Sequence, residues 1–187
     1  MHLFEYNNCN WGNNRTLEHL YEEAFMKIGI IIYSKTGHTK SVADTLEQQL
    51  KDRGHDVTLD FIEIAEQEKD VMHPEITKAP DASPYDFLIF GAPVQGFRLC
   101  AAMSTYLNLL DDMKGKKFAC IVTQALPFKW LGGEQASRKM KSIVTDKGGE
   151  FIGHSIINWN KADREGRIDD TIKHILRLIE IEVAVEA

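Results

Sequence analysis

The segment that begins at Ile28 constrains the fold more than any other part of this chain. Four isoleucines fall within five consecutive positions, a run typical of a strand buried on both faces of a parallel sheet. The run ends in a turn that carries hydroxyl groups at Ser34, Thr36 and Thr39 and a glycine at position 37. Since free amides point out of the N-terminus of the helix that follows, the turn predicts a cradle for a phosphate or similar anion.

The rest of the chain alternates apolar strand patterns with helical patterns. Further strands are predicted at 56–62, 87–90, 117–122 and 151–157, and helices near 42–50, 101–110, 134–147 and 168–179. Five strands alternating with helices predict an open α/β sheet, and right-handed crossovers make its strands parallel. The polar stretch 63–84 is interpreted as a long loop or a short irregular helix, and 91–97 as a turn.

Composition excludes several classes of protein. The formal net charge of -6 argues against general nucleic-acid binding, which favours clustered basic residues. The three cysteines form no Cys-x-x-Cys pair, so we expect no metal site and a reducing, cytoplasmic location. The longest apolar runs fall far short of a membrane span, and the N-terminus lacks the pattern of a secretory signal, so no membrane association is expected.

Residues 1–26 do not match the pattern that follows them. They are rich in asparagine and contain a possible helix over 16–25, so the segment is interpreted as an N-terminal extension, helical or disordered. Two explanations remain open: Met26 is the native start, or the segment is an arm that packs on the domain or on a neighbouring subunit. The domain itself is expected to span 27–187.

Several phosphate-binding families are inconsistent with the first loop. A P-loop needs Gly-x-x-x-x-Gly-Lys-Ser/Thr, which is absent, and a dinucleotide site needs Gly-x-Gly-x-x-Gly, whereas this turn holds only Gly37. A phosphate-accepting receiver domain would need acidic residues after the first strand and an aspartate after the third. A cysteine phosphatase would need a cysteine after the first strand. The sequence offers Tyr33-Ser34 and Gly91 at these places.

The remaining pattern resembles the flavodoxin family. Its first loop typically has Ser/Thr-x-Thr-Gly-x-Thr, and Ser34 to Thr39 match this pattern, with His38 where many relatives carry asparagine. The segment Gly91 to Phe97 is similar to the family's second flavin loop, and 123–125 corresponds to the third. The resemblance spans residue 27 to the C-terminus. It implies a three-layer sandwich with a five-stranded parallel sheet of order 2-1-3-4-5, helices on both faces, and flavin mononucleotide (FMN) as the cofactor.

The resemblance also implies which residues bind FMN. The first loop would hold the phosphate, the second would pass the edge of the isoalloxazine ring, and the third would bound the other side of the pocket. Phe97, Phe128 and Trp130 are candidates for covering the ring, although packing is an equal alternative for each. The predicted set is Ser34, Lys35, Thr36, Gly37, His38, Thr39, Pro93, Val94, Gln95, Gly96, Phe97, Thr123, Gln124 and Ala125.

Three functions remain open at this point. The first is an electron carrier between partner proteins, and the second is an NAD(P)H-dependent reductase of quinones or similar small acceptors. The third is a binding or regulatory module that has kept the fold without the flavin. The loop 126–133 is long enough to shape a substrate cavity or to form a homodimer contact. No nucleophile is paired with a base, so no catalytic side chain is predicted and the chemistry would belong to the flavin. No nicotinamide motif is visible, which favours the carrier.

Overall fold

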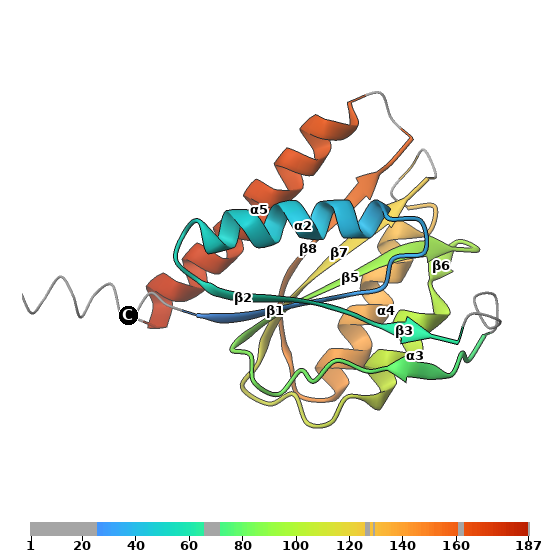
Figure 1. The fold of residues 1–187 in the computed structure, drawn as a ribbon, viewed down its shortest axis with the longest axis horizontal. Helices are drawn as coiled ribbons and strands as arrows, with labels where there is room; N and C mark the ends of the chain where they lie inside the picture. Colours follow the sequence, from blue (N-terminus) through green and yellow to red (C-terminus); the bar gives the residue numbers. More distant parts are fainter. Residues whose placement is uncertain (1–25, 66–71, 126–127, 129, 161–162, 187) are drawn as a thin grey trace, which may run out of the picture.

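The computed structural model describes residues 26–65, 72–125, 128, 130–160 and 163–186, which form a layered α/β domain (Figure 1). Its elements follow one another along the chain in the alternation that the sequence predicts. They are β1 (Lys27–Ile32), α2 (His38–Lys51), β2 (Asp56–Phe61), β3 (Glu63–Ile64), β4 (Ile76–Lys78), β5 (Phe87–Gln95), β6 (Arg98–Leu99), α3 (Ala101–Leu109), β7 (Lys117–Gln124), α4 (Gly133–Asp146), β8 (Glu150–Asn158) and α5 (Arg164–Glu186).

The main sheet has the order β2-β1-β5-β7-β8, and all four pairs along this path are parallel. This confirms the predicted order 2-1-3-4-5. The apolar runs set the register: Ile30 lies beside Leu59 of β2 on one side and Ile89 of β5 on the other. β1 is therefore a central strand, which explains why its isoleucines are apolar without alternation.

Helices cover both faces of the sheet. α2 and α5 pack on the face that contains Ile28, Ile30 and Ile32, whereas α3 and α4 pack on the face that contains Ile31 and Phe90 (Figure 1). Adjacent isoleucines of β1 thus belong to two separate apolar cores, as expected when successive side chains point to opposite faces. None of the described helices, including the 23-residue α5, has the length and apolar character required to cross a membrane.

Two predicted loops contain strands instead. The segment 91–97 was expected to be a turn, but β5 continues through Pro93 to Gln95 and then pairs with β6 in a hairpin. β5 pairs with β7 as far as Pro93, and from Val94 onward it pairs with β6. Pairing therefore keeps the backbone of β5 extended through this segment. The stretch 63–84 likewise includes β3 and β4, which form a small antiparallel sheet in which Glu63 pairs with Lys78.

The beginning of the described chain belongs to the core. Met26 is only 5% exposed, and its carbonyl oxygen accepts a hydrogen bond of 3.1 Å from the amide of Asp56. Met26 therefore packs with the residues that follow it. Of the extension predicted over residues 1–26, positions 1–25 lie outside the described residues.

Candidate functional site

Three loops meet at the edge of the sheet where β1, β5 and β7 end (Figure 1). From β1 the chain first moves outward to β2 and then crosses back to β5 on the other side of β1. The loops after β1 and β5 therefore leave the sheet in opposite directions and open a crevice between them, which is where ligands bind in sheets of this kind. All the residues predicted to bind a cofactor lie on these three loops or at the ends of their strands.

The first loop has the geometry of an anion-binding turn. Gly37 has a φ of 83°, a left-handed conformation that glycine adopts without strain, and α2 begins directly after it. Lys35, Thr36 and Gly37 are exposed, and the amide of Lys40 donates a 3.2 Å hydrogen bond to the hydroxyl of Ser34. The turn thus presents hydroxyl groups and the N-terminal amides of a four-turn helix to solvent.

Thr39 differs from the other hydroxyl residues of this loop. Its side chain is buried, and its hydroxyl lies 2.9 Å from the hydroxyl of Thr123 at the end of β7. A hydrogen bond between two buried groups 84 positions apart joins the first and third loops. The structure therefore gives Thr39 an internal bonding role, while Ser34 and Thr36 remain at the surface.

An aromatic stack supports the first loop from the side of β8. The ring of His38 lies 4.1 Å from that of Trp159, nearly parallel to it, and the guanidinium of Arg164 lies 5.0 Å from the indole ring centre. Burial lowers the pKa of His38 below its ordinary value, and the positive charge of Arg164 lowers it further. Sequence reasoning missed Trp159 and Arg164, although a tryptophan directly after the last strand was the available signal.

The second loop is a tight hairpin that holds an aromatic residue in a strained conformation. Gln95 pairs with Arg98, and the two residues between them, Gly96 and Phe97, have φ of 54° and 65°. Positive φ at both central positions defines a turn whose twist suits a two-residue hairpin, but for phenylalanine it costs about 1–2 kcal/mol. Phe97 is nevertheless 58% exposed, so its ring is largely accessible to solvent and is not packed in the core.

The other predicted residues of this strand lie before the turn. Pro93, Val94 and Gln95 are half-buried, and the carbonyl oxygen of Pro93 accepts a 3.3 Å hydrogen bond from the amide of Cys100. The side chain of Val94 lies close to Gly132, where an added Cβ would come within 2.8 Å of it. The hairpin thus packs against the start of α4.

The third loop is held by its own hydrogen bonds. The amide nitrogen of the Gln124 side chain donates a 2.8 Å bond to the carbonyl of Phe128, and Asn160 donates a 3.1 Å bond to the carbonyl of Ala125. These contacts favour the interpretation of Gln124 as a residue that stabilises the loop. Phe128 and Trp130 stack on each other with ring centres 5.8 Å apart, and they are 54% and 69% exposed.

The two buried cysteines of the described chain lie in environments that keep their thiols protonated. Burial raises the pKa of the Cys100 thiol to about 12 and that of Cys120 further, so neither thiol is a nucleophile near neutral pH. Across the described part of the chain, no group of three or more His, Cys, Asp or Glu side chains is placed to hold a metal ion.

No protein-family model matches the chain, but solved structures resemble it. A WrbA-like flavodoxin from Agrobacterium tumefaciens is 14% identical with a TM-score of 0.64, over 87% of this chain and 99% of that one. Flavodoxin 2 from Bacillus cereus is 18% identical with a TM-score of 0.58, over 83% and 99%. A Fusobacterium nucleatum flavodoxin bound to FMN is 20% identical with a TM-score of 0.56, over 81% and 98%. The chain therefore has the flavodoxin fold.

Proposed function

We propose that this protein binds FMN at the three loops and acts as a flavodoxin-like redox protein. The observation that carries the proposal is the first loop, in which half-buried Ser34, exposed Thr36 and the N-terminus of α2 surround the turn at Gly37. Its position at the switch point of the sheet supports this assignment. The solved flavodoxin from Fusobacterium nucleatum, described as bound to FMN, adds support from a protein of the same fold.

In this proposal the phosphate of FMN accepts hydrogen bonds from the first loop. The hydroxyls of Ser34 and Thr36 and the amides at the start of α2 serve as donors, and Thr39 holds the loop in place through Thr123. Hydrogen bonds to a charged group contribute about 1.5–3 kcal/mol each, so a few of them bind a dianion without a buried cation. Lys40 is directed elsewhere, because its amino group pairs with Asp44 at 2.7 Å.

The flavin ring would lie between the hairpin and the third loop. The exposed rings of Phe97, Phe128 and Trp130 offer aromatic surface for stacking, and backbone groups of the Gly96 turn can contact the ring edge. The bound flavin would supply the electron acceptance and donation. The chain itself would orient the ring and adjust the reduction potential through hydrogen bonds and solvent exclusion.

Within this class we favour an electron carrier that serves partner proteins in the cytoplasm. An exposed flavin edge is sufficient for a carrier, and the sequence contains no recognisable nicotinamide-binding motif. An NAD(P)H-dependent reductase of quinones or similar small acceptors is the second candidate. It is favoured by one observation, a large cavity that borders the hairpin. A homodimer built around the third loop is compatible with either function.

Purification of the protein tests the proposal directly. We expect a yellow protein with flavin absorbance, whose released chromophore has the mass of FMN, or a colourless protein that becomes yellow when FMN is added. A colourless protein that takes up no FMN would refute both candidate functions. Steady oxidation of NADPH or NADH in the presence of a quinone would then identify a reductase, and its absence would support the carrier.

A further inference from the structure

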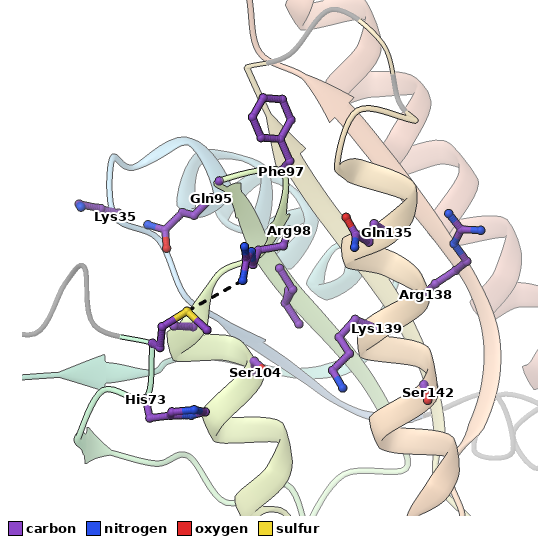
Figure 2. A pocket seen from close by; sticks show the side chains of 14 residues that line it. Lys35, His73, Gln95, Phe97, Arg98, Ser104, Gln135, Arg138, Lys139 and Ser142 are labelled. Atoms are coloured by element: carbon purple, nitrogen blue, oxygen red, sulfur yellow. Dashed lines mark hydrogen bonds between the residues drawn. The ribbon is translucent and has the colours of Figure 1, made fainter.

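A cavity of about 1110 Å³ lies between α3 and α4, next to the hairpin of the proposed flavin site (Figure 2). The hairpin forms its upper end, α3 contributes Ala101 and Ser104, and α4 contributes Gln135, Lys139 and Ser142. Sites for small molecules commonly have volumes of about 300–1,000 Å³, so this space is large enough for a molecule of nucleotide size. We call it the α3–α4 cavity.

The charged side chains of the α3–α4 cavity are basic. Arg98 and Lys139 extend into the space between the helices, whereas the side chain of Arg138, which also contributes to the lining, extends from the opposite side of α4 (Figure 2). Of the described residues that line it, none is an aspartate or glutamate, although the whole chain has a net charge of -6. None of the three cations forms an ion pair with another residue in the part of the chain that the structure describes. Among the described residues, positive charge is therefore concentrated on this side of the cavity.

Apolar groups line the same space. Leu99 is buried beneath it, and Ala101, Met72 and Phe97 contribute carbon surface near the cations. The guanidinium of Arg98 lies 3.9 Å from the sulfur of Met72. A ligand that matches both features has an apolar body that covers this surface and an anionic group that reaches Arg98 and Lys139.

We propose that the α3–α4 cavity binds a small organic anion, namely a phosphate or carboxylate carried on an apolar or aromatic body. This inference goes beyond the proposed FMN site, since the cavity reaches that site only at Lys35 and at the hairpin residues Gln95 to Phe97. A ligand in the cavity would contact the hairpin from the side of the helices. If the proposed function is correct, such a ligand would lie beside the flavin as a second substrate or an effector.

Calorimetric titration of the full chain, purified with its flavin, tests this proposal. The probes are ADP for a phosphate, 2-naphthoate for an aromatic carboxylate, and 2-naphthalenemethanol as an uncharged analogue. We expect at least one charged probe to bind more tightly than about 1 mM, and binding should weaken as salt is added. Arg98→Gln and Lys139→Gln should each weaken binding by about tenfold. Lys141→Gln should have no effect, because Lys141 lies outside the cavity with its amino group 4.7 Å from the Phe151 ring.

The two charged probes show whether the cavity prefers a phosphate or a carboxylate. Binding of ADP alone indicates a nucleotide-like phosphate, binding of naphthoate alone indicates an aromatic carboxylate, and binding of both indicates that either group suffices. The proposal is overturned if neither binds, if the uncharged analogue binds equally well, or if Lys141→Gln weakens binding as much as Lys139→Gln.

Titration of Thr36→Ala separates this proposal from the FMN site. Probe binding in the α3–α4 cavity should survive that substitution, whereas binding at the first loop should not, and loss of probe binding would contradict the cavity assignment. Flavin absorbance of each sample reports independently on the proposed function. Failure of one assignment is therefore visible without failure of the other.

Discussion

The two parts of the proposed FMN site are built in opposite ways. The first loop is tied into the protein: Thr39 bonds to Thr123 in the interior, and His38 stacks on Trp159. The ring-binding part is open, because Phe97, Phe128 and Trp130 are 54–69% exposed. The proposed site thus combines a loop joined to the interior with an aromatic surface that is open to solvent.

This difference follows from the physical chemistry of the two recognition tasks. Donors for a charged phosphate are effective only when they already point in the right direction, since ordering them during binding would reduce the affinity. Aromatic surface gives binding energy by being removed from water, so it has to be exposed beforehand. Substitutions in the two parts should therefore differ in their effects, since FMN affinity and the free energy of unfolding should change separately.

Thr36→Ala should have the largest effect on affinity. Loss of one hydroxyl donor to the phosphate is expected to weaken FMN binding by about 1.5–3 kcal/mol, or roughly tenfold to a hundredfold, with little change in stability because the side chain is exposed. Fluorescence titration with FMN measures this. Thr45→Ala on the outer face of α2 is the matched control, and equal losses in the two variants would contradict the phosphate assignment.

Thr39→Val should affect stability more than affinity. The substitution leaves the buried hydroxyl of Thr123 without the partner that Thr39 provides, at an expected cost of about 1–3 kcal/mol in the free energy of unfolding. Urea denaturation measures this cost. The double variant Thr39→Val with Thr123→Val should regain most of it, since both hydroxyls are then gone. If Thr39→Val alone is as stable as the original protein, the two loops are not joined by this hydrogen bond.

Phe97→Asn should raise the stability of the fold while it lowers the affinity for FMN. Asparagine tolerates the left-handed conformation at this position, so stability should rise by up to about 1 kcal/mol. FMN affinity should fall, because an aromatic surface is removed. Phe97→Ala is the control: it removes the same ring, but alanine does not favour the left-handed conformation, so it should bring no gain in stability. A loss of stability in Phe97→Asn would contradict the inferred strain.

The smallest expected effect is the change in stability with pH that arises from His38. Since the pKa of His38 is lowered from 6.5, the unfolded chain takes up a proton more readily than the folded one as the pH falls below that value. His38 therefore contributes stability that is complete above pH 6.5 and declines below it. NMR titration of its ring should give a pKa below 6.5, rising when FMN adds negative charge nearby. An unchanged pKa on addition of FMN would place the phosphate elsewhere.

Much of the fold was predictable because local patterns encode it. The apolar run at Ile28 identified a buried strand and the alternation of strands and helices predicted a parallel sheet, whereas the correct sheet order came from the resemblance to the flavodoxin family. The hairpin between β5 and β6 was not predicted, because Gly91 and Pro93 suggest a turn when the pairing strands on either side are unknown. Neighbouring strands decided the conformation there.

The site was predictable only as a set of loops. The spacing of Ser34, Thr36 and Gly37 indicated an anion-binding turn, and the structure provides the helix N-terminus that such a turn needs. The contacts of Thr39 with Thr123 and of His38 with Trp159 join distant parts of the chain, and no local pattern encodes them. The predicted FMN contacts themselves remain predictions.

The affinities of FMN and riboflavin for the same protein test the central claim most directly, because the two ligands differ only in the phosphate. If the first loop binds this group through at least two hydrogen bonds, FMN should bind about a hundredfold more tightly than riboflavin, or better. Thr36→Ala should reduce that ratio. Equal affinities for the two ligands would contradict the claim that the turn at Gly37 holds a phosphate.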